Sequence, residues 1–471
     1  MKKIKEHKNL IIISFIICYS LFLVTFINKE SDYFWHIKAG EYFFKHGIVF
    51  KDVFSWSVAG KYWMSHEWLF EYIMYFLKVL FGNFNMIIYI LLCLIGIYLV
   101  IFKYNQESIK KNTFFYFIWM LISTILVSFI QARPHFISFL LLSITIYFLY
   151  DFINNDSKKI YFIPLITILW SNLHGGSSNL GYIFTFIFLI IGLFDFKFKK
   201  IESKRLSKDK LIKLLIVGLV SILCTAINIH GFKMTIYPYI NLADDTMINM
   251  INEWAPTSIS DIMHLPFFLL SIMILILFLF SDKRIKFIDL ALFGVGFILG
   301  LKSIRFWPYL YILSSFFVFD YVSEFEFNNL YSIIIIFNIL LIGFFIFSFK
   351  NIYKEINYEY EFLNKEMVDK VKESKFERMF NHYDIGGELI YHDVKVFIDG
   401  RADLYSDNNL LRPYNNIVDL EFDYLAQLHK YDFDSFLLLS YSELDNYISS
   451  SNKYDLVLKS GDYSLYKKKT S

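Results

Sequence analysis

Polar and ionisable side chains gather in short segments that separate long apolar runs of the sequence. The first of these segments carries Asp32, Trp35, His36, Asp52, His66 and Glu67. Later segments carry Arg133, His135, Asn172, His174, Asn228, His230, Glu253, Trp254, Lys302 and Arg305. Ionisable groups at or within membrane depth are costly, and they usually mark functional sites.

These residue types suit group transfer from a phosphate-bearing donor. Six basic side chains could bind a phosphate or diphosphate: Arg133, His135, His174, His230, Lys302 and Arg305. Asp32 could deprotonate an acceptor hydroxyl, and Glu67 is a second candidate catalytic acid. A carboxylate near a phosphate-binding rim predicts glycosyl transfer from a lipid-linked donor.

Each residue taken alone also has a simpler interpretation. A single histidine at a helix end is more often structural, and the tryptophans fit an interfacial aromatic belt. Arg133 and Arg305 could extend to lipid headgroups. Asp399, Gly400 and Arg401 could form a charged turn after a strand, or the C-terminal part could place Arg401 or Asp403 near the acceptor. The accumulation of polar residues is what favours a functional site.

The elements that must position these residues are membrane helices. The chain has 471 residues, of which 56% are hydrophobic and 19% charged, whereas a soluble domain carries about 25% charge. The net charge of +2 gives no indication of nucleic-acid binding. The three cysteines, Cys18, Cys93 and Cys224, lie in apolar runs without the spacing of a metal site or redox pair.

Apolar length predicts eleven membrane-spanning helices. Their ranges are 9–28, 84–102, 113–131, 136–152, 160–173, 180–196, 211–229, 263–281, 287–303, 305–322 and 330–349. Segment 66–82 is ambiguous. If it does not cross, the basic block 197–210 lies in the cytoplasm, as the positive-inside rule requires. We therefore expect a juxtamembrane helix at 66–82, a cytoplasmic N-terminus and an extracytoplasmic C-terminus.

A change of composition near residue 350 predicts two domains. Residues 1–349 form the transmembrane domain, with a first extracytoplasmic loop and its juxtamembrane helices at 29–83. Residues 350–471 form a soluble extracytoplasmic α/β domain. Its expected strands are 394–398, 436–439, 454–459 and 463–466, with a helix around 417–430 and turns at 386–387 and 460–462.

Several motifs resemble bacterial membrane proteins related to the GT-C glycosyltransferases. They are Ser31-Asp32-Tyr33-Phe34-Trp35-His36 with Gly40; Gly47; Asp52-Val53-Phe54-Ser55; Gly60; Trp63 to Leu69; Arg133-Pro134-His135; Trp170 to Gly176; Asn228 with His230-Gly231; Glu253-Trp254 with Pro256; Tyr383 to Gly387; and Phe397 to Asp403. The likeness covers nearly the whole chain.

This resemblance implies a GT-C-like membrane bundle that takes a sugar from a polyprenyl-phosphate carrier at the outer face. It points to Asp32 as the catalytic centre. Ser31 stands where a second nearby acid is common, so Asp52 or Glu67 would supply a partner. A divalent cation such as Mg²⁺ or Mn²⁺ is left open, because a cationic rim could stabilise the leaving phosphate without one. The expected substrate-binding residues are Trp35, His36, Asp52, His66, Asn172, Asn228, Glu253, Trp254, Asp399, Arg401 and Asp403.

The resulting hypothesis is a glycosyltransferase of a bacterial plasma membrane, with a lipid-linked sugar donor, membrane lipids and a glycan, lipid or protein acceptor as partners. One alternative is a transporter or flippase of lipid-linked glycans. That class carries polar residues at the membrane midplane, where this sequence has mostly Ile, Leu and Phe. The other alternative is a non-catalytic scaffold that binds partners through residues 350–471.

Overall fold

The computed structural model describes residues 8–28, 30–241, 254–322, 331–356 and 360–469. The chain divides into two compact units. The helical unit comprises Met1–Asn28, Met86–Leu242 and Ile251–Tyr353 in their described parts. The mixed unit comprises the described parts of Lys29–Asn85 and Lys354–Ser471.

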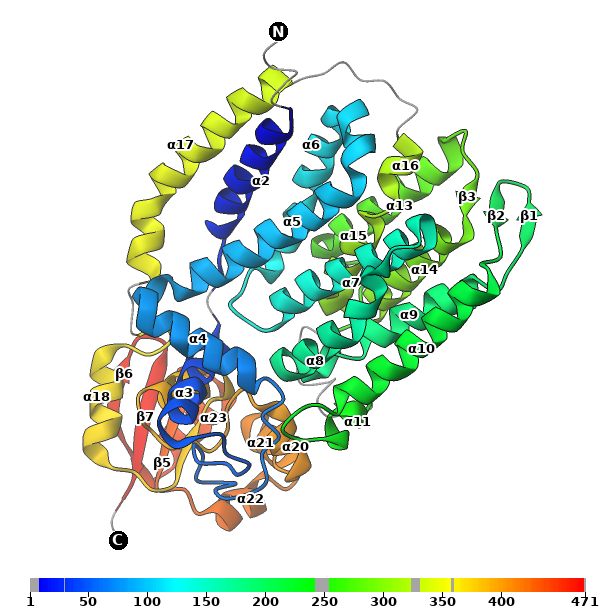
Figure 1. Ribbon diagram of the computed structural model, residues 1–471. Coiled ribbons are helices and arrows are strands. Elements are labelled where there is room, and N and C mark those ends of the chain that lie inside the picture. The colour runs from blue at the N-terminus through cyan, green and yellow to red at the C-terminus, as the bar shows by residue number, and fades with distance from the viewer. Residues whose placement is uncertain (1–7, 29, 242–253, 323–330, 357–359, 470–471) are drawn as a thin grey trace. The chain divides into compact units, whose positions relative to one another are not determined.

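The helical unit consists of apolar helices joined by short turns (Figure 1). Its α-helices are α2 (Lys8–Val24), α5 (Asn85–Lys111), α6 (Thr113–Ile122), α7 (His135–Asn155), α8 (Ile163–Leu173), α9 (Leu180–Ile191), α10 (Lys208–Thr225), α11 (Phe232–Asn241), α13 (Leu265–Phe280), α14 (Phe287–Lys302), α15 (Trp307–Ser314), α16 (Val318–Val322) and α17 (Tyr331–Ile356). Helices are the expected result, because a lipid-facing backbone must satisfy its hydrogen bonds within its own segment.

Short 3₁₀ segments connect these helices. They are η2 (Ser123–Phe129), η3 (Lys158–Phe162), η4 (Gly175–Ser177), η6 (Ile262–His264) and η7 (Ile304–Phe306). A small sheet of β1 (Phe196–Phe198), β2 (Ile201–Ser203) and β3 (Ile285–Lys286) joins two loops, with β1 antiparallel and β3 parallel to β2.

Every predicted apolar segment coincides with a helix, so their helical character is confirmed. Among the described residues, four runs are long and apolar enough to cross a membrane: Trp68–Lys111, His135–Asn155, Ile262–Phe280 and Tyr331–Phe349. Lys8–Val24, Thr113–Phe129 and Gly175–Ile191 are shorter apolar helices. The chain therefore has helices suited to a membrane, and the count of eleven spans stays a prediction.

The mixed unit combines the first loop with the C-terminal part of the chain. The first loop supplies α3 (Ser31–His46), α4 (Trp68–Phe81) and η1 (Gly82–Phe84). The C-terminal part supplies α18 (Lys365–Ser374), η8 (Tyr383–Ile385), α19 (Gly386–Tyr391), α20 (Ala402–Asp407), α21 (Leu411–Val418), α22 (Tyr424–Tyr431) and α23 (Glu443–Ser450). α3 packs against both α4 and α19.

A four-stranded sheet forms the core of this unit's C-terminal part (Figure 1). The strands are β4 (Met379–Asn381), β5 (Ser435–Leu439), β6 (Tyr454–Ser460) and β7 (Tyr463–Lys468), in the order β4-β5-β7-β6. β4 and β5 are parallel, and the other pairs are antiparallel. Three expected strands and the turn at Gly461, with φ of +60°, are confirmed.

The strand expected at 394–398 is wrong, because this segment pairs outside the sheet. The side-chain Oδ1 of Asn381 accepts from the Phe397 backbone N–H, and Val396 forms a parallel bridge to Ser55 of the first loop. The edge strand is instead β4, which no apolar run indicated.

Two smaller expectations also need correction. The helix expected around 417–430 is broken, because Leu420 and Asp423 adopt positive φ values of 51° and 81° between α21 and α22. Gly386 and Gly387 begin α19 instead of forming a turn. A Cβ at Gly387 would lie 2.2 Å from the Ser31 carbonyl oxygen, so glycine is needed here for close approach of α19 to α3.

The boundary between units differs from the sequence division at residues 349 and 350. Residues of the first loop share one unit with the C-terminal part of the chain. Composition could not indicate this, because the association depends on glycines and polar pairs between segments more than 300 residues apart in the sequence, such as Arg401 and Asp52.

Candidate functional site

The carboxylate of Asp32 lies in the first turn of α3, within the mixed unit. A negative side chain is favoured there by the helix dipole. Asp32 is 6% exposed, and its Oδ1 accepts a hydrogen bond of 2.9 Å from Trp35 Nε1. A Cβ added at Gly400 would lie 1.6 Å from the same oxygen, so any other residue at this position would displace the carboxylate.

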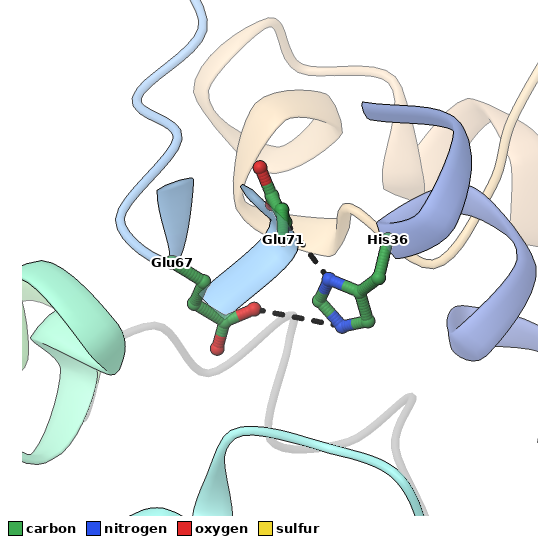
Figure 2. Close-up of side chains that lie close together, drawn as sticks. All are labelled: His36, Glu67 and Glu71. Atoms are coloured by element: carbon green, nitrogen blue, oxygen red, sulfur yellow. Dashed lines mark ion pairs between the residues drawn. The ribbon is translucent and has the colours of Figure 1, made fainter. Parts of the chain in front are cut away.

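Acidic and histidine side chains alternate in a row that includes His36, which lies one helical turn after Asp32 on α3. The row consists of Glu71, His36, Glu67, His66 and Asp403. The His36 ring lies between the two glutamates, with Nδ1 at 3.7 Å from Glu71 and Nε2 at 3.7 Å from Glu67 (Figure 2). His66 Nε2 lies 3.3 Å from Glu67, and His66 Nδ1 lies 3.5 Å from Asp403. We call these five residues the acid–imidazole row.

The carboxylates of the acid–imidazole row favour positive charge at His66. Burial by itself would lower the pKa of His66. The carboxylates of Glu67 and Asp403 outweigh it and raise this pKa well above its ordinary value. His36, Glu67 and Glu71 are all buried.

A second buried cluster joins the first loop to the segment after residue 398. Arg401 donates from Nη1 to Asp52 at 2.6 Å, and from Nε and Nη2 to Asp399 at 2.8 and 2.7 Å. Asp52 also accepts from the Ser55 hydroxyl, and Asp399 accepts from the Tyr405 hydroxyl. We call Asp52, Asp399 and Arg401 the arginine trio.

The arginine trio is closed to solvent and covered by aromatic rings. The guanidinium lies over Trp63 at 4.8 Å and over Phe54 at 5.3 Å from their ring centroids. Burial would lower the pKa of Arg401, but Asp399 and Asp52 hold it above its ordinary value. The Arg401 guanidinium is hydrogen-bonded to both carboxylates of the trio. This cluster therefore holds the first loop, through Asp52, next to the segment that contains Gly400.

In the helical unit, the structure brings together several residues that the sequence singled out. Asn228 Nδ2 donates to Asn172 Oδ1 at 3.2 Å, which links the segment after α10 to the end of α8. His174 Nδ1 lies 2.7 Å from Ser138 Oγ and 2.9 Å from Ser177 Oγ. Trp170 Nε1 donates to the Ser138 hydroxyl, so His174 belongs to a buried polar network.

The remaining predicted residues of this unit lie at helix ends. His135, at the start of α7, has Nε2 2.9 Å from the Phe129 carbonyl oxygen, and Arg133 lies two residues before it. The Arg305 guanidinium lies 5.2 Å from the Trp254 ring centroid. Lys302 ends α14 and is exposed. His230 is buried and its backbone N–H donates to Asn228. Glu253 lies outside the described residues.

Glu71 and Gly400 were not among the predicted site residues. Glu71 lies in segment 66–82, for which only a juxtamembrane helix was predicted. Its spacing of four from Glu67 was the available signal, because residues i and i+4 share a helix face. No pattern in the sequence indicated that Gly400 lies against Asp32, since that contact depends on the tertiary fold.

Comparisons with known proteins bear on the fold. Neither a scan against models of protein families nor a search of curated proteins found a match. Among solved structures, the crystal structure of the Archaeoglobus fulgidus oligosaccharyltransferase, tethered to an acceptor peptide containing the NVT sequon by a disulfide bond, matches with a TM-score of 0.55. The match covers 93% of this chain and 70% of that chain at 12% identity.

The likeness shows the fold. The chain shares its fold with this oligosaccharyltransferase structure, and the relation to GT-C glycosyltransferases and to a bacterial subgroup stays a prediction. At 12% identity it assigns no role to any residue of this chain.

Proposed function

We propose that the chain is a membrane glycosyltransferase that moves a sugar from a polyprenyl-phosphate-linked donor to an acceptor at the extracytoplasmic face. The observation that carries this proposal is the Asp32 carboxylate, held by Trp35 against Gly400. The oligosaccharyltransferase fold and the apolar helices support it. The neighbour's acceptor is a peptide, so a peptide is the first acceptor to test here.

The proposed reaction is a substitution at the anomeric carbon of the donor sugar. An acceptor hydroxyl attacks this carbon, the bond to the phosphate oxygen breaks, and the proton of the hydroxyl passes to Asp32. The polyprenyl phosphate leaves with the bonding electrons. Basic side chains of the helical unit would stabilise its charge: Arg133, His135, His174, His230, Lys302 and Arg305.

The direct test is an assay of purified protein in detergent with a radiolabelled polyprenyl-phosphate sugar and candidate peptide, glycan and lipid acceptors. We expect transfer of label by the wild-type chain and its loss in Asp32→Asn. General base catalysis contributes about 10²- to 10⁴-fold. No transfer from any lipid-linked sugar, with donor binding retained, would favour the flippase or scaffold alternatives.

Topology gives a second test. The proposal requires Asp32 and Arg133 on the same side of the bilayer. Single cysteines introduced at solvent-exposed positions next to these residues in the same two segments, in a chain with Cys18, Cys93 and Cys224 replaced by serine, should both react with an impermeant maleimide from outside. Labelling from opposite sides would exclude the proposed site.

A further inference from the structure

Three side chains of metal-binding type converge within the first-loop part of the mixed unit. His36 comes from α3, Glu67 precedes α4 and Glu71 lies in the first turn of α4. One possible ligand atom from each residue lies within 4.8 Å of those of the other two (Figure 2). Small side-chain rotations would bring three such atoms to the spacing of a coordination sphere, whose bonds are about 2.0–2.2 Å long.

An independent observation is the state of the His36 ring. His36 is 2% exposed, and its Nδ1 has no hydrogen-bond partner among the described residues. Buried polar atoms are nearly always hydrogen-bonded, and an exception needs a physical explanation. This nitrogen faces Glu71 Oε1 at 3.7 Å, which is beyond hydrogen-bonding distance but within reach of a shared cation.

The charges of the three residues also favour a bound cation. Two buried carboxylates face the His36 imidazole; Glu67 also pairs with His66, whereas Glu71 is only 1% exposed and lies on the Nδ1 side of His36. Buried charges require a compensating partner. A divalent cation between the three side chains would neutralise both carboxylates and use the unpartnered nitrogen.

Surrounding residues would hold such ligands in place. The Ser65 hydroxyl donates to Glu71 Oε2 at 3.0 Å, which leaves Oε1 directed at His36. The Trp35 ring lies 3.8 Å from the His36 ring centroid, and Phe70 meets the same ring edge-on at 5.1 Å. Outer hydrogen bonds and packing of this kind orient the ligands of metal sites.

We propose that His36, Glu67 and Glu71 bind a divalent transition-metal ion. An imidazole ligand favours Zn²⁺ or Fe²⁺ over Mg²⁺ and Ca²⁺, which prefer oxygen ligands. Three protein ligands leave a coordination position open, as in catalytic sites. Asp32 lies four residues before His36 on α3, so the two side chains share a helix face. The proposal does not depend on glycosyl transfer.

The competing explanation is a protonated His36 that bridges the two glutamates without any metal. Stoichiometry distinguishes the two. The purified chain is stripped with EDTA, dialysed against a low concentration of Zn²⁺ and analysed by elemental mass spectrometry. We expect about one tightly bound Zn²⁺ per chain, lost in His36→Gln and in Glu71→Gln. Glu41→Gln, on the same helix but paired with Lys38 and Lys45, is the matched control and should keep it.

A measurement on the wild-type chain keeps the test valid should the variants misfold. With Mn²⁺ as the probe, pulsed electron paramagnetic resonance should detect coupling to a single imidazole nitrogen. The absence of bound Zn²⁺, equal binding by the Glu71→Gln variant, or Mn²⁺ without nitrogen coupling would each overturn the proposal. None of these readouts uses transferase activity, so failure of the proposed function is a separate result.

Discussion

Two polar clusters of the mixed unit differ in how completely their side-chain atoms are hydrogen-bonded to one another. In the arginine trio, the two carboxylates accept hydrogen bonds from the Arg401 guanidinium and from neighbouring hydroxyl and backbone N–H groups, at distances such as 2.6 and 2.7 Å. In the acid–imidazole row, the four contacts span 3.3–3.7 Å, and one buried nitrogen lacks a hydrogen bond. Both clusters include residues of the first loop and of the C-terminal part.

This difference in hydrogen bonding distinguishes a cluster that stabilises the fold from a cluster that could bind a ligand. A charged cluster that satisfies its own atoms fixes the backbone around it, here next to Gly400 and Asp32. A cluster with buried polar atoms that lack hydrogen bonds lowers the stability of the folded protein. Such destabilised clusters are typical of sites that bind a ligand.

Arg401→Met should destabilise the protein most. It leaves the carboxylates of Asp52 and Asp399 buried without their cation, and breaking a buried pair costs about 3–5 kcal/mol. The thermal unfolding midpoint in detergent should fall sharply. Adding Asp52→Asn and Asp399→Asn to Arg401→Met should recover part of the loss. An unchanged midpoint in the single variant would show that the trio is not structural.

Gly400→Ala should affect turnover more than folding. The added methyl group would overlap the Asp32 carboxylate and force it to move. A displacement of about 1 Å in a reacting group can cost about 100-fold in rate. Initial rates of sugar transfer measure this effect. Gly343→Ala is the control, because no heavy atom lies within 4 Å of its added Cβ. Equal rates for the two variants would remove Asp32 from the reaction.

Zn²⁺ should stabilise the wild-type chain but not Glu71→Gln. A ligand at about 100 times its dissociation constant stabilises the folded state by about 2.7 kcal/mol. The unfolding midpoint should therefore rise with Zn²⁺ and return with EDTA. An equal rise in Glu71→Gln would place the metal elsewhere in the chain.

Ser65→Ala should have the smallest effect of the four. It removes the hydrogen bond to Glu71 Oε2 but keeps every proposed ligand. Loss of such an outer partner typically costs 10- to 100-fold in metal affinity, and we expect about the lower figure here. Competition with a fluorescent Zn²⁺ chelator measures it. Complete loss of binding would make the serine itself a ligand.

The sequence predicted the local secondary structure better than it predicted which distant segments pair with one another. Apolar length located the helices of the helical unit other than α11, because lipid exposure leaves few alternatives to a helix. It also drew attention to Asp32, His36 and Glu67, whose polarity stands out against apolar surroundings. It did not predict β4, since three residues carry little periodic signal, and the partner that extends the sheet is far away in sequence.

Tertiary contacts, which the sequence does not show, determine which residues come together in the candidate site. Asp399 and Arg401 could be read as a charged turn until Asp52 was found beside them. Gly386 and Gly387 suggested a turn, whereas they permit close packing of α19 on Ser31 and on the segment ending at Ile398. The apposition of Asp32 and the basic side chains of the helical unit stays a prediction.

The central claim is that the Asp32 carboxylate takes part in sugar transfer and does not serve mainly to hold the fold. The most direct measurement is the transfer rate of Asp32→Asn alongside its unfolding midpoint, because asparagine keeps the shape and the hydrogen bond from Trp35. We predict a loss of at least about 100-fold in rate with little change in the midpoint. A variant that transfers sugar at the wild-type rate would contradict the account.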